Sequence, residues 1–547
     1  MKKYKINKIL PVTMAFFIFC LELQTVNLYA QPQREWTSFY PETNTFSSGA
    51  AAMAIDDSGN VYTTGHSEGY NGTIPWNSYT TVKYNTSGVM QWVTNFTGET
   101  GGGKFPHDIA VDNEGNVYVT GYAHRTASDF DFCTIKYNSS GVQQWVRYYD
   151  GPVNGIDRAD KIAIDNNGNI YISGNSTVEG TLGRVITTIK YSNTGDVLWI
   201  KSFGSSIRPS YVNGMKADEN CNIYITGENK GLATTLKYDS SGNLLWSDQV
   251  GFSAASRSLA LDKENNVYIT GYKNNYNPSL NDCLIIKYTP TGVPLWIKLY
   301  NPDSTNNGSD YMGNSIVSDT SGNCYVCGSC RSDQYSGLRQ FIVKYDANGN
   351  KIWEVKNDSL NNQHNSYIDI DKYNQIYIAS NFHIGHPVIS KMKLIKYNNS
   401  GIFLWEQSYI DSLAETSCIK VDKDCNIYQT GHRKQKMLTM KYSQYLGVKP
   451  GEKYLKYNFI LLQNYPNPFN SSTIIRFYIP TLINDNKYVR LEIYDISGRL
   501  VKSFYNKIFM KGFNEVIWNA SNYSSGIYFY RVNINGFEET KKMILIK

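Results

Sequence analysis

The sequence lacks the local motifs that identify most enzymes. It contains seven histidines, but none stands in a metalloprotease helix motif, and no serine occupies a nucleophile elbow. Paired carboxylates for glycoside hydrolysis cannot be recognised by spacing either, because the partners would come from distant parts of the chain. The sequence therefore favours a protein that is not an enzyme.

Positive charge is scarce in the middle of the chain. The formal net charge is +6 over 547 residues, of which residues 1–30 carry +3 and residues 461–547 carry +5. About −2 is left for the long segment between them. Nucleic-acid binding depends on the neutralisation of phosphates, so this nearly neutral segment without a basic stripe predicts no nucleic-acid partner.

The chain is rich instead in copies of one phrase, Asp-x-x-Gly-Asn-(Val/Ile)-Tyr-x-Thr-Gly. Its eight copies begin at Asp56, Asp112, Asp165, Asp218, Asp262, Asp319, Asp371 and Asp422. A second phrase, Lys-Tyr-x-x-x-Gly-x-x-x-Trp, follows each copy, and its Lys-Tyr pairs begin at Lys83, Lys136, Lys190, Lys237, Lys287, Lys344, Lys396 and Lys441. A period of about 50 residues with many short strands predicts a β-propeller.

One repeat illustrates how the fold follows from the residues. Residues 108–112, 116–121, 133–137 and 142–149 read as four short strands. The turns between the first two and the last two strands end in Gly115 and Gly141, which can take positive φ, and Asp112 can cap its turn. We therefore predict an all-β chain with one four-stranded blade per repeat.

The tryptophans indicate how the ring closes. Seven Lys-Tyr pairs are followed by a Trp, but the eighth, at Lys441, is not, and Trp36 stands alone near the N-terminus. We expect the Trp36 strand to complete the last blade, which removes exposed sheet edges and gives eight blades. Seven blades remain the alternative if the irregular repeat at Asp371 does not form one.

Connections of variable length, such as 65–81 and 94–107, must share one face, where binding residues concentrate. Exposed aromatic faces stack on sugars or anchor protein partners. The candidate ligand contacts are two histidines that follow a Thr-Gly pair and seven aromatic residues: His66, His432, Tyr70, Trp76, Tyr79, Phe130, Phe132, Tyr276 and Tyr335. Alternatively, the aromatics pack their own loops, and the histidine position, which Tyr122 and Tyr272 hold in other repeats, is structural.

Two metal hypotheses are weak. Cys324, Cys327 and Cys330 would need a fourth ligand to bind zinc, and Cys324 and Cys327 replace strand positions, where a core role or a local disulfide is expected. The repeat aspartates suggest calcium, but one fixed carboxylate per turn falls short of the six or more oxygens that calcium takes. We predict turn-capping aspartates and no metal or cofactor.

The N-terminus reads as a secretory signal peptide. Four lysines precede the apolar run Ile9–Leu21, and Leu28-Tyr29-Ala30 then places cleavage between Ala30 and Gln31. The run is too short for an ordinary transmembrane helix, so no membrane span is expected after processing. Lipidation at Cys20 is the alternative. We assign residues 1–30 to the signal peptide, 31–446 to the propeller and 447–460 to a linker.

Residues 461–547 form a separate unit that composition alone predicts to be a small β-sandwich. Its motifs are Tyr465-Pro-Asn-Pro-Phe-Asn470, Ser525-Gly526-Ile-Tyr528 and Lys541-Lys542. It closely resembles the type A C-terminal sorting domain of the Bacteroidetes type IX secretion system, although Ser471 stands where many members have proline. The resemblance implies recognition by the secretion machinery, removal of the domain, and either release or attachment to surface lipopolysaccharide. The alternative is an adhesive module.

The Asp-x-x-Gly-Asn-Val-Tyr-x-Thr-Gly phrase resembles the bacterial beta-propeller repeat family and, more distantly, NHL-type propellers. Resemblance to such a family predicts the fold more reliably than the function. We expect a secreted or cell-surface protein whose propeller binds an extracellular glycan or protein without catalysis. An extracellular carbohydrate-active or lyase enzyme in the propeller funnel, and a passive structural protein of the surface layer, are the alternatives.

Overall fold

A computed structural model describes most of the chain outside its N-terminus. The described residues are 32–41, 47–70, 75–98, 102–125, 129–178, 183–204, 210–275, 281–302, 310–331, 338–361, 366–384, 389–411, 414–443, 460–461, 464, 466–479, 489–504, 512–534 and 537–547. All regular elements in these ranges are β-strands. No helix within them has the length and apolar character needed to cross a membrane. The expected signal peptide, its cleavage site and nearly all of the linker lie outside them.

Most of these strands form eight four-stranded sheets, which we number as blades 1 to 8. From the inner to the outer strand, blades 1 to 4 are β2 (Ser47–Ile55), β3 (Val61–Tyr70), β4 (Pro75–Tyr84), β5 (Met90–Phe96); β6 (Lys104–Val111), β7 (Val117–His124), β8 (Phe130–Tyr137), β9 (Gln143–Tyr149); β10 (Arg158–Ile164), β11 (Ile170–Thr177), β12 (Arg184–Tyr191), β13 (Val197–Phe203); and β14 (Ser210–Ala217), β15 (Ile223–Asn229), β16 (Leu232–Tyr238), β17 (Leu244–Gln249).

Blades 5 to 8 follow the same pattern. They are β18 (Ala254–Leu261), β19 (Val267–Asn274), β20 (Asn281–Tyr288), β21 (Pro294–Tyr300); β22 (Asp310–Ser318), β23 (Cys324–Arg331), β24 (Leu338–Tyr345), β25 (Lys351–Asn361); β26 (Ser366–Ile370), β27 (Ile376–Ile384), β28 (Ile389–Tyr397), β29 (Phe403–Asp411); and β30 (Ala414–Val421), β31 (Ile427–Arg433), β32 (Lys436–Ser443), β1 (Gln33–Tyr40).

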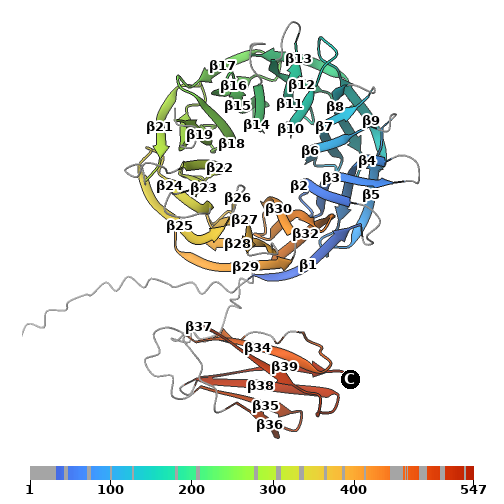
Figure 1. Cartoon of the computed structure of the whole chain (residues 1–547), viewed down its shortest axis with the longest axis vertical. Helices are drawn as coiled ribbons and strands as arrows, with labels where there is room; N and C mark the ends of the chain where they lie inside the picture. Colours follow the sequence, from blue (N-terminus) through green and yellow to red (C-terminus); the bar gives the residue numbers. More distant parts are fainter. Residues whose placement is uncertain are drawn as a thin grey trace, which may run out of the picture. The chain divides into compact units, whose positions relative to one another are not determined.

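The sheets stand in a ring, with their innermost strands around a central axis (Figure 1). The space that the innermost strands surround is called the channel below. Each innermost strand contacts the innermost strands of both neighbouring blades, and β30 contacts β2, so the ring is closed. The hydrophobic core lies between neighbouring sheets rather than in one centre; one cluster, for example, joins Tyr268 of blade 5 to Ile316 of blade 6. The predicted propeller is thereby confirmed, and stacking of blades buries its core.

The last blade is completed from the N-terminus, as the position of Trp36 predicted. Strand β1 pairs antiparallel with β32, and Trp36 is aligned with Lys441. The indole Nε1 of Trp36 donates a hydrogen bond of 3.0 Å to the carbonyl of Thr86 in blade 1, and Lys441 Nζ lies 3.5 Å from the same oxygen. The two ends of the propeller segment, at Trp36 and Lys441, therefore both contact the same turn of blade 1. This arrangement is called the clasp below.

The same clasp recurs between neighbouring blades and accounts for the second repeated phrase. In blade 1, Lys83 and Trp92 both donate to the carbonyl of Ser139 in the next blade, at 3.2 and 3.1 Å. The glycine of that turn, Gly141, has φ +81°, and a Cβ there would stand 2.7 Å from the Trp92 ring. Glycine is therefore required both by backbone conformation and by the close approach of the indole.

The first phrase is explained by a turn within each blade. Asp112 Oδ1 accepts hydrogen bonds from the backbone of Glu114 and Asn116, and its Oδ2 accepts from the Asn116 side chain and from the Tyr118 hydroxyl at 3.0 Å. Both carboxylate oxygens are occupied by local donors. This agrees with the predicted turn-capping role of the repeat aspartates.

The C-terminal unit is described on its own. It contains a three-stranded sheet, β33 (Ile460–Leu461), β34 (Ser472–Ile479) and β37 (Gly512–Asn519), and a four-stranded sheet, β36 (Leu500–Ser503), β35 (Val489–Asp495), β38 (Gly526–Ile534) and β39 (Phe537–Leu545). One apolar cluster includes residues of both sheets, among them Ile475 and Tyr530. The predicted β-sandwich is thereby supported.

The motif residues of this unit hold its two ends together. Phe469 is 3% exposed and packs 5.6 Å from the Trp518 ring, and its backbone pairs with Ile544 and Ile546 beside β39. The side chain of Asn467 accepts a hydrogen bond of 2.9 Å from the Ile544 amide. Tyr465 lies outside the described residues. Pro466, Pro468, Asn470, Gly526 and Lys542 are exposed, and Lys541 lies 3.4 Å from Glu539.

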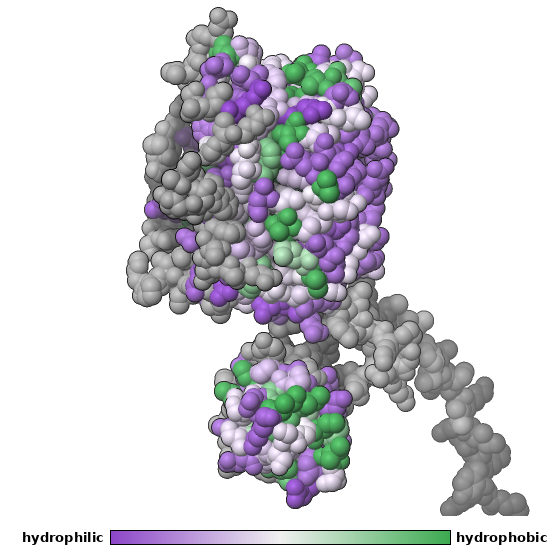
Figure 2. Space-filling view, turned by 90° about the vertical axis from the view of Figure 1, so that its right-hand side faces the viewer, coloured by the Kyte–Doolittle hydropathy of each residue, from purple (hydrophilic) through white to green (hydrophobic). Residues whose placement is uncertain are grey.

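The outer face of the propeller carries scattered apolar side chains. On β21 and the residue before it, Val293, Leu295, Ile297 and Leu299 point outward and are 44–57% exposed. Figure 2 shows apolar residues as separate patches among polar ones on the face it presents. Single exposed apolar residues of this kind are ordinary on soluble proteins and do not define a site.

Candidate functional site at the mouth of the channel

The inner strands carry β-bulges at the end of the channel where the variable connections lie. Their pairing with the second strand skips one residue in seven of the eight blades: Ala51, His107, Asp160, Asn213, Arg257, Asn314 and Ser417. Each stands five residues before the repeat aspartate. Because a bulge re-aims a side chain, this position supplies variable groups at a constant place in the fold.

Bulge residues of neighbouring blades bond to one another. His107 Nδ1 lies 3.2 Å from Asp160 Oδ1, which joins blades 2 and 3. Arg257 Nη1 donates to Asn314 Oδ1 at 2.8 Å, which joins blades 5 and 6. Asn213 Nδ2 donates to the Ser256 carbonyl at 2.7 Å between blades 4 and 5. These polar contacts link blades 2 and 3 and blades 4 to 6 at the channel mouth.

A second set of side chains comes from the second strand of each blade, at the residue that directly follows the glycine of the repeat phrase. It includes the sequence-predicted His66 and His432, and also Tyr122, Glu228 and Tyr272. The Arg257 guanidinium lies 5.0 Å from the Tyr272 ring centre, and the His107 ring lies 5.0 Å from that of Tyr122. Within a blade, the bulge residue therefore meets the residue after the glycine.

Members of both sets in blades 4 to 6 line a cavity of about 550 Å³ at the channel mouth. Its lining comes from five neighbouring blades: Lys161, Tyr211, Asn213, Glu228, Ala255, Arg257, Tyr272, Asn314, Ser366 and Tyr367. Tyr211 is 44% exposed, and burial raises the pKa of Glu228. A larger cavity of about 790 Å³ lies elsewhere, along the seam between blades 8 and 1, and is lined by β1, the β4–β5 turn and the β31–β32 hairpin.

Charged groups also converge deeper in the channel. Lys216 and Lys420 stand two residues before the repeat aspartates of blades 4 and 8, and the charge of Lys420, together with reduced hydration inside the ring, lowers the pKa of Lys216. Burial raises the pKa of Asp369, whose carboxylate accepts from the Ile370 and Val421 amides at 2.9 and 2.7 Å. That carboxylate therefore ties blade 7 to blade 8.

The two predicted histidines come close together at the mouth. Burial lowers the pKa of His66, and the neighbouring His432 lowers it further. His432 Nε2 lies 3.9 Å from Glu415 Oε2. Phe130 is half-buried, with its ring centre 3.7 Å from that of His124 and 5.1 Å from that of Tyr122. It therefore packs within its own blade, as the structural alternative anticipated.

Two other predicted contacts are buried. Tyr79 is 0% and Phe132 is 1% exposed, and both belong to core clusters between blades. The expectation of ligand contact is wrong for both, because strands β4 and β8 already begin at Pro75 and Phe130 and place these rings inside the sheet stack. The Tyr70 and Trp76 side chains, and Tyr276 and Tyr335 altogether, lie outside what the structure describes.

The three close cysteines do not converge. Cys324 and Cys330 contribute to the cluster between blades 5 and 6, whereas Cys327 faces the cluster between blades 6 and 7. An odd spacing along a strand places side chains on opposite faces. All eight cysteines among the described residues are free, and seven of them are buried. Their role is packing, as the strand positions predicted.

Comparisons with known proteins agree with this architecture. Residues 463–547 match the secretion system C-terminal sorting domain family, and residues 91–125 and 144–180 match the beta-propeller repeat family. An uncharacterized WD repeat-containing protein of Acanthamoeba polyphaga mimivirus is 27% identical over 132 residues, which cover 20% of this chain and 10% of that protein. The chain thus spans a tenth of the length of this curated relative.

Solved structures with similar folds are distant in sequence. PorZ, an essential surface component of the type IX secretion system of Porphyromonas gingivalis, is 11% identical with a TM-score of 0.40, over 90% of this chain and 75% of PorZ. The β-propeller domain of the Trilobed protease from Pyrococcus furiosus is 10% identical with a TM-score of 0.38, over 62% of this chain and 94% of that domain.

The repeat phrases, the ring of sheets and the sandwich with its docked motif lead to one assignment. The sorting domain directs export through type IX secretion to the cell surface or the extracellular space. The chain is a beta-propeller repeat protein that carries a type IX secretion C-terminal sorting domain.

Proposed function

We propose that the channel mouth binds an extracellular glycan and that the chain acts as a non-catalytic binding protein outside the cell. The observation that carries this proposal is the composition of the 550 Å³ cavity, which combines Tyr211, Tyr272 and Tyr367 with amide, carboxylate and cationic side chains. Tyrosine rings offer apolar faces for sugar rings, and a few placed polar groups fix the orientation of a ligand.

The polar groups of the mouth are held in place before any ligand arrives. Arg257 bonds to Asn314 and stands over Tyr272, so its guanidinium has little freedom to lose. Asn213 is likewise fixed by its bond to the Ser256 carbonyl. Preorganised side chains reduce the entropy cost of binding, which supports recognition at a shallow site.

The proposal is tested by applying the full chain to a glycan array and measuring the affinity for any hit by calorimetry. Tyr211→Ala, at the exposed ring of the mouth, is expected to weaken binding at least about tenfold, which corresponds to about 1.4 kcal/mol. Tyr373→Ala is the matched control, because Tyr373 is 56% exposed in a repeat-aspartate turn, away from the mouth. Equal effects of the two substitutions would refute the location.

Catalysis in the channel is the second candidate, and the charged groups around Lys216 and Asp369 favour it. Perturbed pKa values that cluster in a cleft are common at catalytic sites. The same array samples are therefore assayed for new reducing ends and unsaturated products. Turnover that disappears in Lys216→Met would replace the binding proposal by an enzymatic one. The full chain is also applied to an array of extracellular proteins. Binding only to that array would move the ligand class from glycan to protein, and no binding to either array would favour a structural surface protein.

A further inference from the structure

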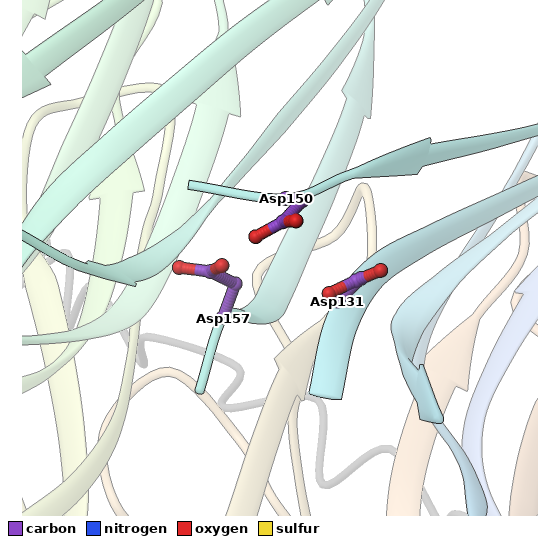
Figure 3. Close-up of side chains that lie close together, drawn as sticks. All are labelled: Asp131, Asp150 and Asp157. Atoms are coloured by element: carbon purple, nitrogen blue, oxygen red, sulfur yellow. The ribbon is translucent and has the colours of Figure 1, made fainter. Parts of the chain in front are cut away.

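Three carboxylates meet at the junction of blades 2 and 3. Asp131 lies on β8, Asp150 directly follows β9, and Asp157 directly precedes β10. One oxygen from each lies within 4.8 Å of the others, and Figure 3 shows the three groups turned toward a common space. The bulge and turn positions of the repeat do not include them, so they form a feature separate from the channel mouth.

Among the described residues no cation forms an ion pair with these three carboxylates, and Arg125 only partly offsets the charge of Asp131. Asp131 is 4% exposed, and among the described residues it accepts no hydrogen bond and forms no ion pair. Asp157 is 0% exposed and accepts from the Gly151 and Thr177 amides at 2.7 and 2.9 Å, which fixes its carboxylate. A buried carboxylate without a partner is costly, so this arrangement calls for a cation.

A buried hydroxyl stands beside the cluster, near the Asp157 carboxylate but without a well-formed hydrogen bond. Ser176 is 0% exposed, and its Oγ has no hydrogen-bond partner among the described residues. It nevertheless lies close enough to Asp157 to lower the pKa of that carboxyl group. A buried polar atom without a partner is rare in folded proteins. Here it adds a neutral oxygen next to the three carboxylates.

We propose that Asp131, Asp150 and Asp157 bind a calcium ion. Calcium takes six to eight oxygen ligands at 2.3–2.6 Å, so oxygens on opposite sides of the ion are about 5 Å apart, and the observed spacing fits without rearrangement. Two or three carboxylates can bind in bidentate fashion, and the exposed Asp150 leaves one side open to water. An all-oxygen set without nitrogen or sulfur disfavours zinc.

The ion would join three segments: β8, the end of β9 and the start of β10. The end of β9 is connected to the start of β10 by residues 150–157, the link between blades 2 and 3, and Asp157 also bonds through its amide to the Phe130 carbonyl at 2.6 Å. Bridging these segments would stabilise this connection on the face that carries the channel mouth. The site is therefore structural, and it does not depend on the glycan proposal.

The test uses the full chain stripped with EDTA and dialysed. Calorimetry with calcium chloride is expected to show saturable binding, with a rise of at least about 2 °C in the unfolding midpoint at saturation. Magnesium chloride is expected to give much weaker binding, because magnesium demands a smaller octahedral site. The absence of both heat and a midpoint shift with calcium would overturn the proposal.

Asp150→Asn is the decisive variant, because Asp150 is exposed and its substitution leaves the core intact. Calcium affinity should fall at least about tenfold, while the midpoint of the calcium-free protein should stay the same or rise, because one of three mutually repelling charges is removed. Asp57→Asn, at an exposed carboxylate in a repeat turn, is the matched control and should bind calcium like the unmodified chain. Unchanged affinity in Asp150→Asn, or an equal loss in Asp57→Asn, would refute the assignment to this cluster.

Discussion

Arg257 of blade 5 and Asn314 of blade 6 occupy the same position of consecutive repeats, and a hydrogen bond of 2.8 Å joins their side chains across the blade junction. The variable residues of the mouth are thus ligand candidates and blade connectors at the same time. A substitution at such a residue should change both the affinity for a ligand and the free energy of unfolding. The contribution to stability is measured on the protein without ligand.

Asn314→Ala removes the acceptor of this bond and leaves the Arg257 guanidinium half-buried with one partner fewer. We expect a loss of about 1–2 kcal/mol in the free energy of unfolding, since bonds to charged groups contribute more than neutral ones. Urea unfolding of the full chain measures it. Arg257→Ala in the Asn314→Ala background should add less than it does alone, because paired residues couple. Simple additivity would argue against the bond.

The clasp at ring closure gives a second prediction. Gly88 has φ +77°, and a Cβ there would stand 2.4 Å from the Trp36 ring, whereas Gly168 has φ +75° and only Asn193 within 4 Å, at 3.9 Å. Gly168→Ala should cost about 1 kcal/mol for the backbone conformation alone. Gly88→Ala should cost about 3 kcal/mol, because overpacking against the indole is added. Equal losses in the free energy of unfolding for the two variants would show that the Trp36 indole moves aside without cost.

The repeated strands and turns were predictable because the interactions that set them are local. Asp112 is satisfied by donors no more than six residues away, and the other seven turn aspartates also accept from the tyrosine six residues on. The closing strand was also readable, because Trp36 stands roughly one period before Trp92 and lacks a partner phrase of its own. Local chemistry and period together determine the ring.

The contents of the site were less predictable. Tyr79 and Phe132 were assigned to loops, but the hairpins extend farther and bury both rings. The bulge residues were missed, because a bulge depends on pairing between two strands. One signal was available, since the position five residues before each repeat aspartate is polar in most copies and breaks the apolar alternation. Which of these residues meet across blades depends on positions about 50 residues apart.

The buried thiols give a third prediction. Burial raises the pKa of Cys133, Cys283, Cys324 and Cys327 to about 12, so their reactive thiolate form is almost absent at pH 8. Iodoacetamide should leave all four unmodified in the native chain and alkylate them after unfolding in urea, as read by mass spectrometry. Rapid labelling of any of them in the native protein would contradict their placement in the core.

The burial of Lys396 gives a fourth prediction, on how stability depends on pH. It is 1% exposed, and burial lowers its pKa from 10.5 to about 8 despite the nearby Asp371. Between about pH 8 and 10.5 the unfolded chain therefore binds a proton at this lysine that the folded chain lacks, so this group makes stability rise with pH in that window. Below pH 8 both states are protonated and the contribution is constant.

Lys396→Met isolates this contribution, because other titrating groups are common to both proteins. The stability of the variant relative to the unmodified chain should fall steadily as the pH is raised from 8 to 10, as followed by urea unfolding at each pH. Lys423→Met, at an exposed lysine, is the control and should keep a constant difference. A constant difference for Lys396→Met as well would mean that this ammonium is solvated in the folded protein.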